Sequence, residues 1–389
     1  MGLKQIGDHT DFSSERISDI CKVSGDAMQE LVQKLFYQLG CSKEESTRIA
    51  KLLVRANLRG HDSHGLVRVN RYVKWLKSGI LVPNQHATVI SDNGAILELD
   101  GNYGFGQTVG EEAVRFGIDK ALAHGVAVVS IRHAGHLGVI GDWANLAAEE
   151  GFISIHMVNV RGSLLVAPFG GTDRRASTAP FCAGVPRKGK PPILVDFATS
   201  MVAEGKALVA LKGGPSLPEG ALISKNGQLT SDPNELYGDT QLNEYPDARS
   251  GPGALTSFGL HKGYTLNFLM EVLGGALTGS GVAGTSGDDK RGICNGMLSI
   301  YLDSKKMSSA KFFEEELDSY CNYVRSSRSN SDGQMQRVLL PGENEEQTIK
   351  IRLAGGLPIP YTTLTDICCV AKENGISIDE SSLLVSNFE

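Results

Sequence analysis

The stretch AILELDGNYGFGQTVGEEAVRFGIDKALAHGVAVVSI, residues 95–131, decides the fold class. Its two ends are short apolar runs typical of strands, and the apolar residues of 109–124 recur at helical spacing. The same alternation continues along the chain, with a helix expected at 138–150 and strands expected at 153–158 and 193–197. Strands that alternate with helices in this way predict an α/β domain.

The segments before and after this region have mainly helical patterns. Before it, the capping boxes of Asp26 with Gln29 and of Ser42 with Glu45 predict the starts of two successive helices. After it, helical spacing is found at residues 264–278, 309–325 and 364–374, and a strand is expected at 297–302.

These patterns predict how the chain divides into domains. Residues 1–22 carry little pattern, so we expect a loosely structured extension there. Residues 86–261 are expected to form the α/β domain, inserted between residues 23–85 and 262–389, which pack together as one mainly helical domain. Residues 213–252 are rich in Gly, Pro, Asn and Asp, which predicts a long surface excursion.

The composition is typical of a soluble protein. The 389 residues are 41% hydrophobic and 21% charged with a net charge of −6, so there is no basic footprint for nucleic acid. Seven cysteines without a CxxC pair argue against a metal site or a disulfide framework. No apolar run resembles a membrane span or a signal peptide. We therefore expect a cytoplasmic protein with no metal, nucleic-acid or membrane partner.

The first candidate site is RGHDSHG, residues 59–65, followed by Arg68 and Tyr72. A histidine such as His64 titrates near physiological pH and can transfer a proton, and the planar guanidinium of Arg68 can bind a carboxylate. Two other interpretations stay open from the residue types alone. The stretch can be a polar loop with a structural Asp cap, or Ser63 and His64 can belong to a Ser-His-Asp hydrolase, although no G-x-S-x-G motif is present.

The second candidate is HAGHLG, residues 133–138, between a predicted strand and a predicted helix. Backbone N–H groups at the start of a helix bind phosphate or carboxylate, and His136 would lie at that point. A turn that needs glycines for its backbone explains the pattern equally well. The Gly-rich residues 100–106 lack the G-x-G-x-x-G order of a Rossmann phosphate loop, so we interpret them as a turn.

Further short motifs are PFGG at 168–171, STAP at 177–180, DFATS at 196–200, HKGY at 261–264 and PGEN at 341–344. Asp196 ends an apolar run, where a carboxylate can orient a catalytic group or cap a helix. Lys262 opens a predicted helix and can bind an anionic group of a cofactor, or it can be a solvated charge. The PGEN motif by itself indicates a turn.

Taken together and in this order, the SHG-x-x-R, G-H-x-G, PFGG, D-x-ATS and KGY motifs resemble those of the type 2 malate/L-lactate dehydrogenase family. The family includes ureidoglycolate and sulfolactate dehydrogenases and piperideine-2-carboxylate reductases. The likeness runs from about Leu31 to Gly355 and implies a non-Rossmann α/β fold in which residues 86–261 bind cofactor and substrate. It also implies a homodimer and NAD- or NADP-dependent transfer of a hydride between the nicotinamide cofactor and a small 2-hydroxy or 2-oxo acid.

The resemblance also implies residue roles. His64 matches the family's proton donor, Ser63 and Asp196 match its charge relay, and Arg68 matches a contact to the substrate carboxylate. His136 matches a histidine at the nicotinamide end, which has also been assigned to proton transfer. The positions that match cofactor contacts are His136, Leu137, Gly138, Val139, Ile140, Val160, Asp196, Phe197, Ala198, Lys262, Gly342, Glu343 and Asn344.

One departure from the family pattern is Ser-Thr-Ala-Pro at residues 177–180, where the family usually has Gly-Thr-Asn-Pro. Thr178 in this segment matches a substrate-binding position. Because of this departure, two alternatives stay open: a catalytically altered relative that binds a dinucleotide, and a cyclic imino acid reductase. The choice between NAD and NADP is open as well, with Arg161, Arg174 and Arg175 as candidates to pair with a 2′-phosphate.

Overall fold

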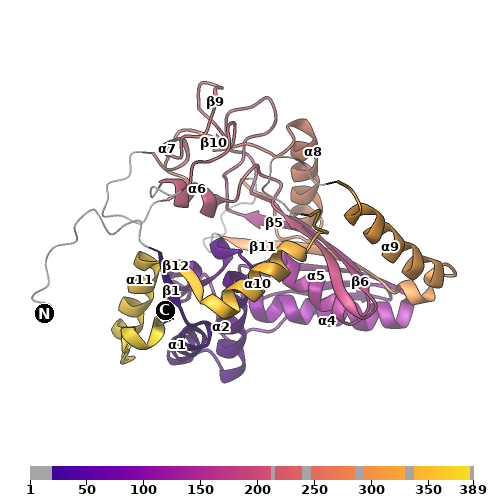
Figure 1. Ribbon diagram of the computed structural model, residues 1–389, viewed down its shortest axis with the longest axis horizontal. Coiled ribbons are helices and arrows are strands. Elements are labelled where there is room, and N and C mark those ends of the chain that lie inside the picture. Colours follow the sequence, from indigo (N-terminus) through magenta and orange to yellow (C-terminus); the bar gives the residue numbers. More distant parts are fainter. Residues whose placement is uncertain (1–19, 212–214, 239–246, 285–292, 329–336, 386–389) are drawn as a thin grey trace, which may run out of the picture.

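The computed structural model describes residues 20–211, 215–238, 247–284, 293–328 and 337–385. Its core is a seven-stranded sheet with the order β2-β3-β4-β11-β5-β6-β7, in which β3 and β4 are parallel and the other neighbours antiparallel (Figure 1). The strands are β2 (Thr88–Asn93), β3 (Ile96–Asp100), β4 (Val126–Ala134), β5 (Ile153–Arg161), β6 (Phe181–Arg187), β7 (Lys190–Phe197) and β11 (Cys294–Leu302). The expected α/β class is therefore confirmed.

Helices cover both faces of this sheet. On one face lie α4 (Gly106–His124) and α5 (Ile140–Glu149), as Figure 1 shows. Their apolar side chains, such as that of Trp143, are buried against the strands. On the opposite face, α8 (His261–Met270) continues into the π-helical segment η4 (Glu271–Ala276). This segment lies directly on β5 and β11, because a Cβ atom on Gly274 would be only 2.8 Å from the Met157 carbonyl oxygen.

The two ends of the described chain share one core, as the helical patterns predicted. Buried Leu35 and Leu53 belong to the same apolar cluster as Leu357 and Ile367, and Figure 1 shows the indigo and yellow segments packed together. The elements involved are β1 (Ile20–Val23), α1 (Gly25–Gln38), α2 (Lys43–Leu58), α3 (Val69–Lys77), β12 (Leu357–Pro360) and α11 (Tyr361–Glu373). Strands β1 and β12 pair antiparallel.

Three local expectations differ from the structure. Residues 20–22, expected in a loose extension, pair within β1, and residues 1–19 lie outside the described residues. Helix α1 is capped by Ser24, whose hydroxyl accepts a backbone N–H, and Asp26 lies in the first turn. The strand expected at 297–302 within the helical part is the end of β11, at the centre of the sheet.

Residues 213–252, expected to be a surface excursion, contribute instead to a small folded unit at the top of Figure 1. Leu222, Leu236 and Tyr237 are almost fully buried there in a core of their own. Its elements are α6 (Glu204–Leu211), β8 (Leu222–Ile223), β9 (Leu229–Thr230), α7 (Asn234–Tyr237) and β10 (Ala254–Leu255). Residues 212–214 and 239–246 are outside the described part of the chain.

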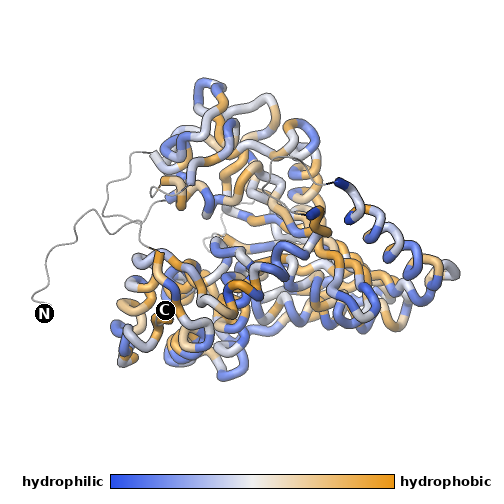
Figure 2. The backbone as a smooth tube through the Cα atoms, viewed as in Figure 1, coloured by the Kyte–Doolittle hydropathy of each residue, from blue (hydrophilic) through white to orange (hydrophobic). Residues whose placement is uncertain are grey.

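The remaining helices lie outside the sheet. They are α9 (Ala310–Arg325), which projects at one side of Figure 1, and α10 (Glu343–Gly355). Figure 2 shows hydrophobic residues concentrated in the strands, whereas both colours alternate along the helices that cover them. Within the described ranges, no helix combines the length and apolar character that crossing a membrane requires.

His156 on β5 makes the stability of the fold sensitive to acid. Its Nδ1 and Nε2 atoms lie 2.9 Å from Ser299 Oγ and 3.0 Å from Ser154 Oγ, and burial lowers the pKa of His156 to about 3. The unfolded chain gains a proton there near pH 6.5, and the folded chain does not. We therefore expect this residue to reduce the free energy of unfolding by about 1.4 kcal/mol per pH unit as the pH falls below 6.

Urea unfolding between pH 7 and pH 4 measures this effect. The variant His156→Gln keeps hydrogen-bonding atoms but does not titrate, so its stability is expected to depend less steeply on pH by about that amount. Equal pH dependence in the two proteins would contradict the assignment.

Candidate active site

The RGHDSHG stretch follows α2 and folds into two short 3₁₀ turns, η2 (Asp62–His64) and η3 (Leu66–Arg68). Asn57, buried in α2, fixes both of them. Its Nδ2 donates to Asp62 Oδ1 at 2.6 Å, and its Oδ1 accepts from Leu66 N at 2.7 Å. Gly65 is required between them, because a Cβ atom there would lie 2.1 Å from Asn57 Oδ1. These contacts hold the turn in one conformation. Such a well-defined turn argues against the interpretation of RGHDSHG as a simple polar loop.

A row of hydrogen bonds connects this turn to the second motif. His64 Nδ1 lies 3.3 Å from His136 Nε2, and the two rings are within 9° of parallel. His136 Nδ1 lies 2.6 Å from the hydroxyl of Tyr72, which accepts from Gln107 Nε2 at 3.0 Å. Tyr72 and Gln107 are almost fully buried. The structure thus brings the two predicted histidines together and orients them from inside the protein.

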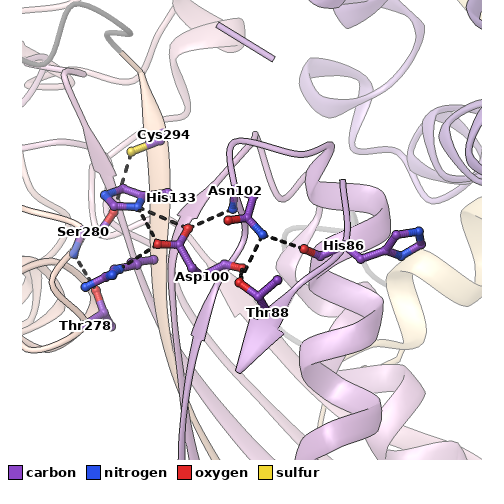
Figure 3. A network of polar contacts seen from close by, with 9 residues as sticks. His86, Thr88, Asp100, Asn102, His133, Thr278, Ser280 and Cys294 are labelled. Atoms are coloured by element: carbon purple, nitrogen blue, oxygen red, sulfur yellow. Dashed lines mark hydrogen bonds and ion pairs between the residues drawn. The ribbon is translucent and has the colours of Figure 1, made fainter. Parts of the chain in front are cut away.

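The turn that carries His136 is held at both ends. Figure 3 shows the Asp100 carboxylate at the end of β3, where it accepts from Asn102 N at 2.9 Å and contacts His133 Nδ1 at 3.1 Å. Asp100 also accepts from Arg132 Nε at 2.9 Å. These contacts fix the last residues of β4, immediately before His136. The Gly-rich residues interpreted as a turn therefore help to position the second motif.

Gly106, the first residue of α4, packs against the backbone of His136. A Cβ atom there would lie 2.2 Å from the His136 carbonyl oxygen. We expect Gly106→Ala to shift this turn, to destabilise the protein by about 1–3 kcal/mol and to reduce turnover. Thermal unfolding and initial rates measure both effects. Gly25→Ala is the matched control, since its nearest contact would be an ordinary 3.6 Å; wild-type behaviour of the Gly106 variant would refute the packing argument.

Asp196, at the end of β7, lies close to the start of α5. Its Oδ2 accepts from Gly141 N at 2.7 Å, and burial raises the pKa of Asp196. Among the described residues, no hydrogen bond joins Asp196 to Ser63 or His64. The charge relay implied by the family resemblance is therefore not formed by direct hydrogen bonds. Asp196 instead caps the start of α5, which is close to the helix-capping role considered for it in the sequence.

Arg68 lines a cavity and is held by two neighbouring groups. Its Nε donates to the Ser63 carbonyl oxygen at 2.5 Å, and its Nη2 lies 3.7 Å from Glu204 Oε2. The side chain is 14% exposed. Arg68 also contributes to the environment of His64, since burial, Arg68 and His61 together lower the pKa of His64 to about 3. This environment therefore favours the neutral form of His64.

Most of the predicted site residues line one cavity of about 830 Å³. They are Ser63, His64, Arg68, His136, Gly138, Val139, Ile140, Val160, Thr178, Asp196, Phe197 and Ala198. A second cavity of about 410 Å³ is lined by Gly342 and Asn344 at the start of α10. The two cavities share the lining residues His61, Val139, Asp196 and Phe197, so they adjoin.

Three predicted cofactor contacts do not line either cavity. The Leu137 side chain is buried, and its backbone N–H donates to Asn295 Oδ1. Glu343 accepts from Leu340 N at 2.8 Å and pairs with Arg325. Lys262 is exposed at the start of α8.

The three arginines suggested for a 2′-phosphate also lie outside the linings of both cavities. Arg174 donates to four backbone carbonyl groups, so its role is structural. Arg175 pairs with Asp173, and Arg161 is buried at the end of β5. No group of three or more potential metal-binding side chains occurs within the described ranges.

The Ser-Thr-Ala-Pro segment at residues 177–180, which departs from the family pattern, places Ser177 and Ala179 in the interior. The Ser177 hydroxyl donates to Glu271 Oε1 at 2.6 Å, and Ser177 is fully buried. Ala179, with a φ of +30°, packs in the apolar cluster that includes Met270. Only Thr178 and Pro180 of this segment line the cavity. The side chains of Ser177 and Ala179 are therefore accommodated by packing and lie outside the cavity lining.

Several residues of the site escaped the sequence analysis. Gln107, Asn57 and Glu204 lie in ordinary helical patterns, where the side chain that turns inward cannot be recognised without the partner it meets. Asn295 comes from β11, whose position at the centre of the sheet was not predicted.

Known proteins with the same architecture extend this description. Residues 23–368 match the family model for malate/L-lactate dehydrogenase. The chain is 37% identical to hydroxycarboxylate dehydrogenase B of Escherichia coli K12, over 90% of this chain and 93% of that protein. It is 32% identical to a malate dehydrogenase of Pyrococcus abyssi, over 91% and 95%.

A solved structure agrees with these matches. The putative malate/lactate dehydrogenase from E. coli superposes with a TM-score of 0.83 at 35% identity, over 92% of this chain and 96% of that one. The agreement covers the helical ends as well as the sheet. On fold and sequence alike, this chain belongs to the malate/L-lactate dehydrogenase family.

Proposed function

We propose that this protein is an NAD- or NADP-dependent dehydrogenase that transfers a hydride between the nicotinamide and C2 of a small 2-hydroxy or 2-oxo acid. The hydroxycarboxylate and malate dehydrogenases among its relatives support this substrate class. The observation that carries the proposal is that His64 and Arg68 line the same cavity. One can transfer the proton of the hydroxyl group, and the other can bind the carboxylate.

The hydrogen bonds of the two histidines distinguish their roles. Both ring nitrogens of His136 are engaged, Nδ1 by Tyr72 and Nε2 by His64, whereas His64 uses only Nδ1 in this row. His64 Nδ1 is engaged by His136, so Nε2 is the ring nitrogen of His64 that is left to exchange a proton with the substrate. We assign the proton transfer to His64 and the orientation of its ring to His136.

Charge determines how His64 acts. During reduction of a 2-oxo acid, negative charge develops on the C2 oxygen. His64 in its protonated, imidazolium form donates the Nε2 proton to that oxygen and is left as the neutral imidazole. General acid catalysis of this kind contributes roughly 10²–10⁴-fold. Burial, and after it the charge of Arg68, lower the pKa of His64; a substrate carboxylate bound to Arg68 offsets the second of these causes and favours the protonated ring. In the oxidative direction His64 accepts the proton of the hydroxyl group.

The adjoining cavities fit an extended dinucleotide. Such a ligand can reach from His136 in the larger cavity, past Asp196 and Phe197, to Gly342 in the smaller one. The backbone at Gly138, at the start of α5, offers N–H groups to its phosphates without a Rossmann loop. When bound, the cofactor supplies or accepts the hydride. The choice between NAD and NADP remains to be measured.

Gly138→Val is expected to weaken dinucleotide binding by more than tenfold, since it adds a branched side chain to a turn that lines the larger cavity, with the Cβ atom 3.7 Å from Gln107 Nε2. Titration with NADH and NADPH, followed by quenching of tryptophan fluorescence, measures this; Trp75 lines the same cavity. Gly138 has a φ of +72°, so the control must carry the same backbone strain. Gly189→Val is matched, with a φ of +65° and open space around it. Equal affinity of both variants would exclude a cofactor at this turn.

The proposed activity is tested by adding reduced cofactor and a panel of 2-oxo acids to the pure protein. Loss of the absorbance of reduced nicotinamide with a 2-oxo acid supports the proposal. Turnover of cyclic imines alone would favour the imino acid reductase, and cofactor binding without any turnover would favour an altered relative. The alternative of a catalytically altered relative was suggested by Ser177 and Ala179. Both residues are buried, so they give that alternative no support.

We further propose a cytoplasmic homodimer. Phe268 and Leu277 on α8 and its extension, and Tyr323 on α9, are large apolar or aromatic side chains more than half exposed, which is typical of a surface that a second subunit covers. None of the seven cysteines, all of which lie in the described residues, forms a disulfide, as is usual in a reducing compartment. Light scattering of the purified protein measures its mass in solution.

A further inference from the structure

Glu204 projects into the larger cavity from the first turn of α6. Its side chain is 14% exposed, the same fraction as that of Arg68 beside it. The approach of α6 depends on Gly205, because a Cβ atom at that position would lie 2.4 Å from Ser63 Cβ. A close helix contact therefore places an acidic group beside the arginine that is expected to bind the substrate.

Two contacts orient the Glu204 carboxylate. Its Oε1 accepts from the Tyr237 hydroxyl at 2.9 Å, and its Oε2 lies 3.7 Å from Arg68 Nη2. Arg68 is turned toward it, since Arg68 Nε donates to the Ser63 carbonyl oxygen at 2.5 Å. An ionised carboxylate has about four acceptor positions, so Glu204 keeps capacity for a further donor.

This pair has a consequence for the ligand. The charges of Arg68 and Glu204 sum to zero, so one substrate carboxylate bound to Arg68 leaves a net charge of about −1 at this pair, and a second carboxylate would add to it. The next substituent of a short acid then lies within a few ångströms of Glu204. The cavity lining has further charged side chains. Those of Lys74, Lys206, Asp247, Arg249 and Asp366 are solvent-exposed and more strongly screened, and that of Arg71 is half-buried.

We propose that Glu204 is a specificity-determining residue that favours a hydroxyl or ammonium substituent on C3 of the substrate and disfavours a second anionic group there. A donor on C3 would occupy a remaining acceptor position of Glu204, whereas a second carboxylate would be repelled by it. The inference rests on the proposed function, because it takes Arg68 as the binding site of the C1 carboxylate.

The test compares kcat/KM for pyruvate, hydroxypyruvate and oxaloacetate in the wild type and in Glu204→Gln. The substitution preserves the shape of the side chain and removes its charge. We expect the oxaloacetate-to-pyruvate ratio to rise by about tenfold or more and the hydroxypyruvate-to-pyruvate ratio to fall. Glu204→Asp, which keeps the charge, should stay near the wild type. Glu219→Gln, an exposed site in the same folded unit, is the matched control.

Ratios within one variant cancel general losses of stability or activity. If Glu204 only holds Arg68 in place, Glu204→Gln changes KM for all three acids by one common factor, and that result would overturn the inference. Absence of turnover with every acid would refute the proposed function instead. Calorimetric binding of lactate and malate then still tests Glu204, because the malate-to-lactate affinity ratio must rise in Glu204→Gln and an unchanged ratio would overturn the proposal.

Discussion

Replacing His64 with alanine is expected to lower kcat by about 10²–10⁴-fold, the usual contribution of a positioned general acid. His64 lines the larger cavity and, in the row that ends at Gln107, is the histidine with a ring nitrogen left for the substrate. His136 cannot replace it while Tyr72 and His64 engage both of its nitrogens. Steady-state rates with a saturating 2-oxo acid and reduced cofactor measure the loss.

Cofactor affinity separates this effect from a general disturbance of the site. His64 lines the cavity away from Gly342, so the dissociation constant of NADH or NADPH is expected to change by less than about threefold. His86→Ala is the control, since His86 is an exposed histidine that lines neither cavity. A kcat close to the wild-type value in the His64 variant would remove this residue from the mechanism.

The second large effect is expected at Arg68. Arg68→Lys keeps the positive charge but loses the planar donor pair, so KM for 2-oxo acids should rise about tenfold or more, with a smaller change in kcat. The lysine of this variant must also replace the hydrogen bond that Arg68 Nε donates to the Ser63 carbonyl oxygen. Because Ser63 lies in the same turn as His64, we expect a moderate loss of kcat together with the rise in KM.

Lys206→Ala provides the comparison for Arg68. Lys206 also lines the larger cavity, but it is exposed at its edge, where solvent screens its charge. We expect less than a twofold change in KM for this variant. An unchanged KM in Arg68→Lys for every acid that is turned over would mean that the carboxylate binds elsewhere.

Local sequence signals predicted the parts of the fold that depend on local interactions. The capping box at Ser42 and the helical spacing of residues 109–124 correspond to α2 and α4. The central place of β11 was not predicted, because it results from pairing with β4 and β5, both more than 130 residues away in the sequence. Nothing in the apolar run of β11 itself specifies those partners.

The same distinction applies to the candidate site. The motifs around His64 and His136 were identifiable because histidines, glycines and an arginine are concentrated within a few residues. Gln107 and Glu204 carry no such signal, since their importance comes from contacts with Tyr72 and Arg68 across the fold. Lys262 matched a family motif, yet it lines neither cavity of this chain.

The account is tested most directly by following the hydride. The protein is incubated with a 2-oxo acid and reduced cofactor carrying deuterium at C4 of the nicotinamide, and the product is examined by mass spectrometry and NMR. We predict a 2-hydroxy acid with deuterium bonded to C2, formed at a rate that falls about 10²–10⁴-fold in His64→Ala. Failure of both NADH and NADPH to reduce any acid in the panel, or a product whose C2 hydrogen comes from the solvent, would contradict it.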